Sequence, residues 1–281
     1  MRISFFLQGP TLTMFDLAAV EAGIAGTEFA GRVMHFPSVG STNALALEAA
    51  QAGARGGVWV ADEQTAGRGR GGHGWHSAVG DGLYVSALVT PPVEAVTALK
   101  ISLATGVAAQ AAIAEVAGLT VDIRWPNDLL LNGRKCGGIL VETAVAPAQD
   151  DARARLRYAV IGVGINLNHA AFPAELEALA TSLRIAGGSA VSREALLAAL
   201  LRALDEELRL LVGGDHGMDN GPDLLERFAR ASSWVRGKRV RVEEGGGYTG
   251  VTSGLDVQGF LQVDGDDGVR RTVLSGGVRE R

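Results

Sequence analysis

The chain has 281 residues, enough for about two domains of roughly 150 residues each. Hydrophobic residues make up 47% and charged residues 20%, which are the proportions of a globular protein and exclude a disordered chain. The 31 acidic residues outnumber the 26 basic ones, and the net charge of −5 argues against a protein that binds nucleic acid through its phosphates.

Cysteine, glycine and lysine each occur at an informative frequency. The single cysteine, Cys136, excludes an internal disulfide and a cysteine-rich zinc site, and it fits a reducing cytoplasm. The 39 glycines are about twice the usual share of roughly 7%. Only Lys100, Lys135 and Lys238 are lysines, so each position at which the chain carries one is a candidate functional position.

The N-terminal segment carries no targeting signal. Residues 1–12 are apolar only briefly, because Gln8, Gly9 and Pro10 interrupt them too early for the core of a signal peptide. We interpret them as an extension or as a mis-called start. No apolar run approaches the roughly 18 residues that a membrane span needs.

The first half of the chain alternates helices with short strands. Helices are expected over 14–24 (with Thr13 as N-cap), 44–52 and 97–118, and strands over 32–36, 58–62, 83–89 and 121–125. The helix over 97–118 is apolar on most faces and is therefore expected in the core. A loop over 67–74 has glycine at 67, 69, 71, 72 and 74.

The strongest hairpin signal of the chain opens its second half. Asn132-Gly133 lies between the apolar runs 128–131 and 135–142, and both central residues of a type I′ turn need a positive φ. A strand over 157–166, a loop, and helices over 193–212 and 224–231 follow. After Gly237, short strands alternate with glycine-containing turns, over 238–243, 248–255, 260–264 and 269–274.

These patterns predict an α+β (mixed α/β) domain with a central mixed sheet and helices, followed by a small all-β module that is open or barrel-like. The predicted division is an N-terminal extension and short helix over 1–30, a larger domain over 31–234, and the β module over 235–281.

The glycine-rich loop is the first candidate site. Arg68 and Arg70 are its charged residues, and no acid occurs between Gln64 and Trp75. Glycines let backbone N–H groups approach an anion, and arginines add paired donors, so anion binding is favoured over a merely flexible surface loop. No helix starts there, as a dinucleotide fingerprint would need, and His73-Gly74 stand where a phosphate-binding P-loop has Lys and Ser/Thr.

The Asn-Gly hairpin carries the second candidate site. A two-residue turn places Leu130 opposite Lys135 and Asp128 opposite Gly137. Asp128 and Lys135 then lie on one face as diagonal neighbours, with about 7–8 Å between their backbones. A lysine and a carboxylate beside Gly137 and Gly138 can bind a metal–nucleotide and a small anion, and we favour this over a surface lysine on a hairpin.

Two further motifs are weaker by themselves. Glycines within the strand at Gly162 and Gly164 suggest the close approach of a ligand or of backbone, and Asn166 either holds a ligand or caps a turn. Ser41-Thr42-Asn43 are preferred helix N-caps, and capping is compatible with binding a polar ligand. His73 and His76 are too few for a metal site, and Cys136 is expected to be a small buried side chain.

In this order, the motifs resemble the biotin–protein ligases. The matching segments are Ser-Thr-Asn at 41–43, Gln-Thr-Ala-Gly-Arg-Gly-Arg at 64–70, Trp75, Arg-Trp-Pro-Asn-Asp at 124–128, Lys-x-Gly-Gly-Ile-Leu-Val-Glu at 135–142 and Gly-x-Gly-Ile-Asn at 162–166. The resemblance extends from about residue 33 to the C-terminus. It implies a catalytic domain followed by an SH3-like module.

The resemblance also implies a role for each matching residue. Biotin would contact Ser41, Thr42, Asn43 and Gln64 at its ring end, and Arg68, Gly69, Arg70, Trp75, Lys135 and Gly138 elsewhere. ATP would contact Arg70, His73, Trp75, Asn127, Asp128, Lys135 and Asn166, with Asp128 as the ligand of Mg²⁺. Lys135, Arg68 and Arg70 would be the catalytic groups. Gly71 and His73 replace basic residues that the family often carries in this loop.

The implied activity is ligation in two steps: biotin and ATP give biotinyl-AMP and pyrophosphate, and a lysine of a biotin carboxyl carrier protein then takes the biotin. Such enzymes act in the cytoplasm, and some form homodimers. Only about 30 residues precede the first matching strand, so we expect no DNA-binding domain of the kind that some members carry. The alternatives are a related lipoyl or octanoyl ligase or transferase, against which the polar Ser-Thr-Asn and Gln set argues, and a non-enzymatic biotin or nucleotide sensor, against which Arg68, Arg70, Asp128 and Lys135 argue.

Overall fold

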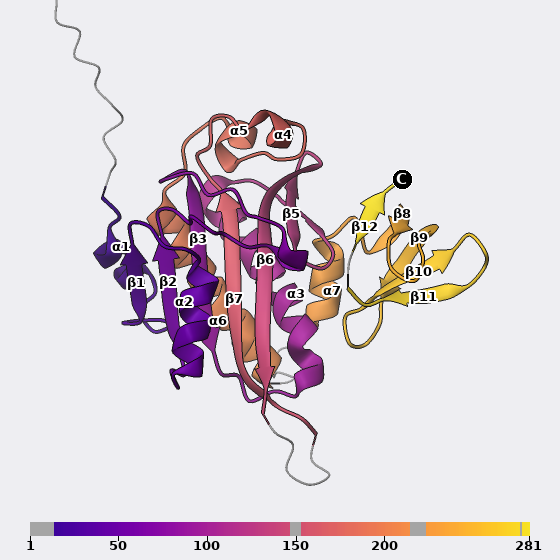
Figure 1. Ribbon diagram of the computed structural model, residues 1–281, viewed down its shortest axis with the longest axis horizontal. Coiled ribbons are helices and arrows are strands. Elements are labelled where there is room, and N and C mark those ends of the chain that lie inside the picture. Colours follow the sequence, from indigo (N-terminus) through magenta and orange to yellow (C-terminus); the bar gives the residue numbers. More distant parts are fainter. Residues whose placement is uncertain (1–13, 147–152, 214–222, 276) are drawn as a thin grey trace, which may run out of the picture.

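The computed structural model describes residues 14–146, 153–213, 223–275 and 277–281, which form two sheets and the helices around them (Figure 1). The larger sheet has the order β1-β2-β3-β7-β6-β5-β4. Its β1 is parallel to β2, and its other pairs are antiparallel, so the sheet is mixed. Its strands are β1 (Val33–Phe36), β2 (Gly57–Ala61), β3 (Gly82–Val89), β4 (Asp122–Arg124), β5 (Asp128–Leu131), β6 (Arg134–Val145) and β7 (Leu156–Asn166).

Helices cover both faces of this sheet (Figure 1). On one face, α3 (Ala98–Ala117) and α6 (Arg193–Gly213) pack in the main core, with α1 (Leu17–Gly23) beside α6 and α7 (Leu224–Arg230) beside α3. On the other face, α2 (Thr42–Gln51) places Ala46 and Ala50 against Leu88 and Val160. Because successive strand residues point to opposite faces, β7 gives Ile161 to the first core and Val160 to the second.

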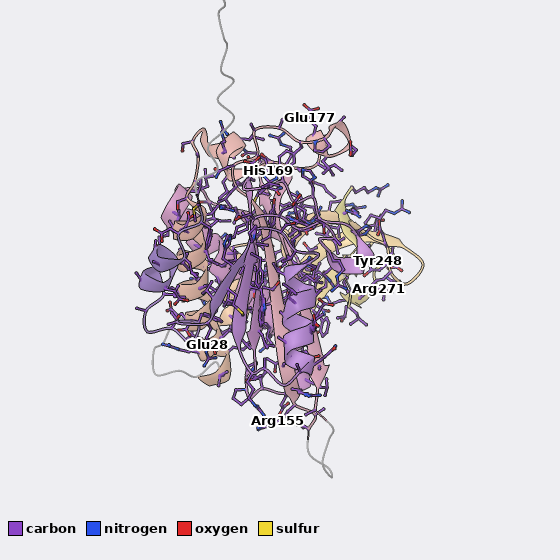
Figure 2. All side chains as sticks on the ribbon, turned by 60° about the vertical axis from the view of Figure 1, so that its left-hand side comes forward. Glu28, Arg155, His169, Glu177, Tyr248 and Arg271 are labelled. Atoms are coloured by element: carbon purple, nitrogen blue, oxygen red, sulfur yellow. The ribbon has the colours of Figure 1, made fainter. Side chains whose placement is uncertain are left out.

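The C-terminal residues form the second sheet, with the order β11-β10-β9-β8-β12. Its strands are β8 (Arg236–Val242), β9 (Tyr248–Leu255), β10 (Leu261–Gly265), β11 (Arg270–Val273) and β12 (Val278–Glu280). Arg271 of β11 lies over the ring of Tyr248 of β9, 4.8 Å from its centroid, and both residues are labelled in Figure 2.

A close contact joins the second sheet to the first. Trp125 Nε1 donates to Gly259 O at 3.0 Å, and this bond is buried. Gly259 has a φ of +92°, and a Cβ on it would lie 2.7 Å from Leu103 Cδ1 in α3. Only glycine allows this approach. Val240 and Leu261 of the second sheet belong to the same core as Leu103, so the two sheets share one apolar interior.

The predicted mixed sheet with helices and an all-β C-terminal sheet is confirmed, with differences in the short elements. The first helix begins at Leu17, where Asp16 accepts from Ala19 N as its cap; the predicted cap Thr13 and residues 1–12 lie outside the described residues. Two helices of four and five residues, α4 (Ala174–Glu177) and α5 (Leu183–Gly187), stand where a loop was predicted, because such lengths show no periodicity. The three-residue β12 was missed for the same reason.

We expected no segment long and apolar enough to span a membrane. By length and composition alone, this expectation was wrong. Residues 95–117, 23 in all, meet that test. In the structure, 56% of the 18-residue apolar window within this range is buried, and α3 packs along α6 and the sheet, so its apolar faces are those of a core helix.

Candidate active site

A stretch of sheet without side chains forms the floor of the site. Gly138 of β6 lies opposite Gly164 of β7, and Gly162 lies two residues before Gly164 on the same face. This face is the one that α2 covers, but Ala46 and Ala50 reach only the neighbouring rows. The glycines therefore leave the sheet backbone open to whatever lies beyond the N-terminus of α2.

Two side chains lie directly on this floor. A Cβ at Gly162 would lie 2.1 Å from Asn43 Oδ1, and a Cβ at Gly164 would lie 2.7 Å from Trp75 Cε2. The Lys135 Nζ lies 5.4 Å from the centre of the Trp75 ring, within the range of a cation–π contact. Any side chain at either glycine would displace Asn43 or Trp75.

These residues enclose a pocket with about 450 Å³ of empty space, which includes the space open to solvent at its mouth. All ten residues predicted to contact biotin line it. The lining is Ser41, Thr42, Asn43, Gln64, Arg68, Gly69, Arg70, Trp75, Val85, Asn127, Lys135, Gly138, Ile139, Leu140, Gly162, Val163 and Gly164.

One end of the pocket is a network of neutral polar groups. The N–H and Oγ1 of Thr42 donate to Gln64 Oε1 at 2.9 and 3.1 Å. Ser86 Oγ donates to Asn43 Oδ1 at 2.5 Å and lies 2.8 Å from Thr42 Oγ1. Ser41 is the N-cap residue of α2, but its side chain makes no cap hydrogen bond. The first turn of α2 thus presents its polar groups to the pocket.

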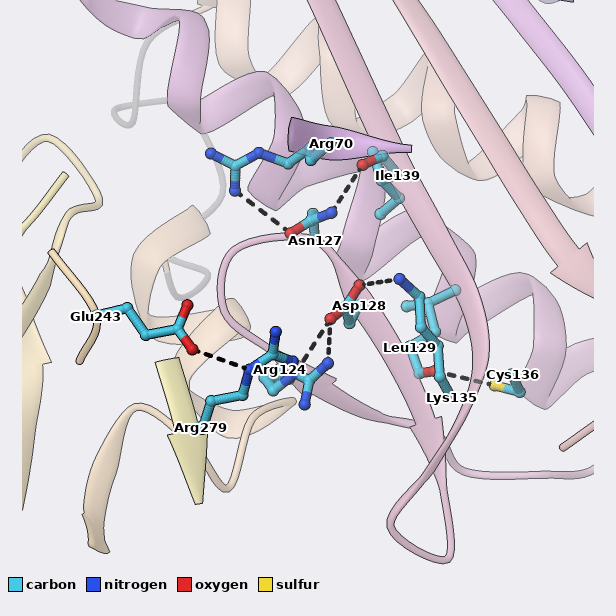
Figure 3. Close-up of polar contacts among 10 residues, drawn as sticks. All are labelled: Arg70, Arg124, Asn127, Asp128, Leu129, Lys135, Cys136, Ile139, Glu243 and Arg279. Atoms are coloured by element: carbon cyan, nitrogen blue, oxygen red, sulfur yellow. Dashed lines mark hydrogen bonds and ion pairs between the residues drawn. The ribbon is translucent and has the colours of Figure 1, made fainter. Parts of the chain in front are cut away.

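The glycine-rich loop brings cations to the other side. Arg68 Nη2 lies 3.7 Å from Glu142 Oε2, and this carboxylate also accepts from Asn43 Nδ2 at 2.9 Å. Arg70 Nη1 donates to Asn127 Oδ1 at 3.4 Å, and Asn127 Nδ2 donates to Ile139 O at 3.0 Å (Figure 3). Gly69 N donates to His73 O at 2.7 Å, which folds the loop back on itself. The His73 side chain is exposed and does not line the pocket.

The hairpin register differs from the predicted one by a bulge. Leu130 lies opposite Lys135 as predicted, but the register shifts next to it, so Asp128 lies opposite Gly138 and not Gly137. The extra residue is Cys136, whose side chain is buried, as expected, and donates to Leu129 O (Figure 3). Burial raises the pKa of its thiol to about 12, so it is not a nucleophile.

Asp128 lies between two cations. Its Oδ1 is 2.5 Å from Lys135 Nζ, and its Oδ2 accepts from Arg124 Nε at 3.1 Å and from Arg124 Nη2 at 2.5 Å (Figure 3). Burial alone would raise the pKa of Asp128, but Lys135 and Arg124 outweigh it and hold the pKa below its ordinary value. Asp128 does not line the pocket, and it fixes Lys135, which does.

The residues present do not fit a protein-held Mg²⁺. Among residues 14–146, 153–213, 223–275 and 277–281, no three His, Cys, Asp or Glu side chains are grouped as metal ligands. Both oxygens of Asp128 are already paired with Lys135 and Arg124. Mg²⁺ takes carboxylates that are not neutralised in this way, so the geometry does not support Asp128 as its ligand.

Asn166 also lies away from the pocket. It is buried at the end of β7, and its Nδ2 donates to Thr181 O at 3.1 Å. The N–H of Thr181 donates to Lys135 O, and the N–H of Lys135 donates to Leu179 O, each at 2.9 Å. This hydrogen bond reaches a residue 15 positions away and does not cap a local turn, so Asn166 ties the segment that holds the Lys135 backbone.

Ser86 and Glu142 hold residues that line the pocket and were not predicted as site residues. Ser86 is the one polar residue among the apolar residues 83–89, and this contrast was the available signal. Glu142 ends the 135–142 motif, but its partner Asn43 is 99 positions away. Such pairing depends on the sheet register, which the sequence does not show.

The comparisons with known proteins agree with this architecture. The Biotin/lipoate A/B protein ligase family model matches residues 35–166, and the Biotin protein ligase C terminal domain model matches residues 236–278. The Bifunctional ligase/repressor BirA of Bacillus subtilis (strain 168) is 35% identical over 249 residues, which cover 87% of this chain and 73% of that protein. The chain belongs to the biotin protein ligase family.

Two other members add detail. The Biotin--[acetyl-CoA-carboxylase] ligase of Mycobacterium tuberculosis is 37% identical over 248 residues, covering 85% of this chain and 84% of that protein. Among solved structures, the biotin protein ligase from Aquifex aeolicus in complex with biotin and ATP superposes with a TM-score of 0.71 at 26% identity, covering 89% of this chain and 99% of that one. Both the sequence and the fold of the ligase family therefore extend over most of the chain.

The Asp128 carboxylate should stabilise the fold in a pH-dependent way. At pH 7, Asp128→Asn leaves Lys135 and Arg124 without their anion, and the free energy of unfolding should fall by about 1–3 kcal/mol. Because the folded pKa of Asp128 is lowered, the advantage of the wild type is full above about pH 4 and is lost as the pH falls through that lowered pKa.

Denaturant unfolding at a series of pH values measures this difference. Glu94→Gln is the control, because Glu94 forms its ion pair with Arg153 at the surface, and it should change stability little. A difference between wild type and Asp128→Asn that stays constant from pH 7 into the acid range would contradict the assignment.

Proposed function

We propose that this protein is an ATP-dependent biotin–protein ligase. The observation that carries the proposal is the pocket itself, in which a neutral polar end and a cationic end share one glycine floor. Biotin has the matching halves, a ureido ring and a carboxylate. A family member that aligns with 85% of this chain is named a biotin ligase. A solved relative is described as a complex with biotin and ATP.

The polar end suits the ureido ring. Thr42, Asn43 and Gln64 line the pocket with hydroxyl and amide groups that can both donate and accept, as a ureido N–H and C=O require, and Ser86 holds Thr42 and Asn43 from behind. Trp75 Nε1 is buried and has no hydrogen-bond partner within the described part of the chain, so it is a donor that a ligand can take. The ring would lie in the pocket beside these groups.

In the first step, a carboxylate oxygen of biotin forms a bond to the α-phosphorus of ATP, and the bond from that phosphorus to the β-bridging oxygen breaks, releasing pyrophosphate. Both reactants are anionic, so the barrier includes their repulsion. Arg68, Arg70 and Lys135, which line the cationic end, would offset that repulsion and hold the reactants together.

In the second step, the amine of an acceptor lysine attacks the acyl carbon of biotinyl-AMP. An amide bond forms, the bond from the acyl carbon to the phosphate oxygen breaks, and AMP leaves while the amine loses a proton. The loop from Arg68 to Arg70 would shield the mixed anhydride from water until the acceptor arrives. We take the acceptor to be a carrier domain of the acetyl-CoA carboxylase type, after the names of the relatives.

We assign the nucleotide to the cationic end of the pocket. Arg70, Trp75, Asn127 and Lys135 line it and would contact the phosphates and the base. Asp128 would act there as a positioning residue, because it touches Lys135 and Arg124 and not the pocket. His73 and Asn166, which lie outside the pocket, receive no direct role, and no step is assigned to a protein-bound metal.

We propose that the activity is cytoplasmic and does not involve DNA, and the net charge supports the second point. The net charge of −5 opposes binding to a phosphate backbone, whereas ATP, biotin and a folded acceptor need only the local cations of the pocket.

A lipoyl or octanoyl ligase is the alternative within the same family model. Its substrates carry a hydrocarbon chain, which cannot hydrogen-bond with the Thr42, Asn43 and Gln64 groups that line the pocket. A site built to hydrogen-bond one substrate rejects an analogue that lacks those groups by roughly 10⁴-fold. The polar end therefore favours biotin.

Exchange of labelled pyrophosphate into ATP tests the proposed function. The wild-type protein should catalyse exchange that depends on biotin, because adenylation is reversible while pyrophosphate is present. Exchange driven by lipoate or octanoate and not by biotin would support the alternative. Binding of biotin without any exchange would make the protein a sensor.

Lys135 should matter more than another lysine of the chain. Lys135→Ala removes a cation that lines the pocket, so biotinyl-AMP formation should slow on the order of a hundredfold. Lys238→Ala is the matched control, because Lys238 pairs with Glu280 on the second sheet, and it should change the rate by less than about threefold. Single-turnover formation of biotinyl-AMP measures both, and equal rates for the two variants would remove Lys135 from the chemistry.

A further inference from the structure

The best-formed hydrogen bond of the Arg70 side chain leads out of the larger domain. Its Nη2 donates to Ser275 O at 2.8 Å, whereas its Nη1 is 3.4 Å from Asn127 Oδ1. Ser275 lies 205 positions away, in the turn between β11 and β12 of the second sheet. The end of the glycine-rich loop is therefore held by a carbonyl group of the C-terminal sheet.

A single carboxylate fixes the orientation of that turn. Glu244, just after β8, accepts three hydrogen bonds: Oε1 from Leu274 N at 2.8 Å, and Oε2 from Ser275 N at 3.1 Å and from Ser275 Oγ at 2.7 Å. Bonds to an ionised acceptor are stronger than neutral ones. Together they fix the Leu274–Ser275 backbone and with it the Ser275 carbonyl that accepts from Arg70.

The sheet that carries Glu244 is itself fixed on the larger domain. Trp125 Nε1 bonds to Gly259 O, and Gly259 is packed against Leu103 of α3. A continuous series of contacts thus runs from the core of the larger domain through the second sheet to the Arg70 guanidinium. Burial of that guanidinium lowers the pKa of Arg70, although Asp128 opposes the shift, and arginine stays charged near neutral pH.

We infer that Glu244 is a positioning residue for the ligase reaction: by holding Ser275, it keeps Arg70 over the pocket. The role of Arg70 toward the activated intermediate rests on the proposed function, but the restraint itself does not. Without Glu244, the turn can rotate its carbonyl away, the loop loses one of its anchors, and biotinyl-AMP escapes more readily into solvent.

The neighbouring glutamate supplies a matched control. Glu243 lies on the same segment, and its contact is a 3.6 Å approach to Arg279 Nε, with 57% of its side chain exposed (Figure 3). Glu243→Ala therefore removes an equal charge next to the same strand without touching the Leu274–Ser275 turn. Glu244→Gln is the conservative variant: its amide oxygen can keep the bonds of one carboxylate oxygen, while its nitrogen cannot accept those of the other.

The first measurement needs no substrate. Amide hydrogen exchange of the loop peptide over residues 64–76 should be at least about threefold faster in Glu244→Ala than in the wild type, and it should be unchanged in Glu243→Ala. Glu244→Gln should lie between them. Equal loop exchange in the wild type and in folded Glu244→Ala would overturn the inference, whether or not the protein ligates biotin.

The second measurement tests whether Glu244 acts through Arg70. Release of labelled biotinyl-AMP from the full-length protein should be about fivefold faster in Glu244→Ala, while the KM for biotin in pyrophosphate exchange should change by less than about twofold. In an Arg70→Ala background, Glu244→Ala should hardly change the rate of biotinyl-AMP release, because Glu244 acts on the intermediate only by holding Arg70. Effects that multiply would show that Glu244 acts elsewhere. Failure of the wild type to exchange pyrophosphate would instead reject the proposed function and leave the hydrogen-exchange result to decide on the restraint.

Discussion

The lack of a side chain at Gly138, Gly162 and Gly164, on one face of β6 and β7, is the constraint on which the site depends. Elsewhere on this face, α2 covers the sheet through Ala46 and Ala50, and the contact is apolar. At Gly162 and Gly164, α2 no longer covers the sheet, and the amide of Asn43 and the ring of Trp75 lie against the strand backbone. The pocket exists because nothing on the sheet fills the space that these two side chains border.

The charges around this floor follow a common pattern. Each cation that faces the pocket is held by a different protein group: Arg68 by Glu142, Lys135 by Asp128, and Arg70 by Asn127 and Ser275. The Arg68 contact is long and half exposed, so a substrate carboxylate can compete for it at little cost. Lys135 is held closely and at a fixed place. The site thus combines one preorganised cation with others on a loop that can adjust to the ligand.

How much of this was predictable from the sequence depends on the range of the interactions. The glycine floor and the glycine-rich loop were predictable, because glycine within a strand and arginine between glycines are recognisable from neighbouring residues alone. The turn at Asn132-Gly133 fixed the pairs next to it, but the bulge at Cys136 shifted Asp128 by one residue, and no turn rule predicts a bulge.

The remaining differences come from partners far away in the chain. Asp128 and Asn166 were expected at the nucleotide, but Arg124 and Thr181 take their polar atoms. Ser86, Glu142 and Ser275 join the site only because the sheet order and the packing of the second sheet bring them there. Residue type and local spacing identify which groups can do the chemistry, and tertiary contacts decide which of them face the ligand.

A calorimetric titration with biotin of the wild type and of Gly162→Ala tests the glycine floor most directly. The added methyl group would meet Asn43 Oδ1 at 2.1 Å, so Asn43 must move and the ring end of the pocket must close. Gly213→Ala is the control, since a Cβ there meets nothing within 4 Å. The account predicts that Gly162→Ala binds biotin at least about tenfold more weakly than both the wild type and the control while keeping its fold, because ring-end hydrogen bonds are lost. Wild-type affinity in a folded Gly162→Ala protein would contradict it.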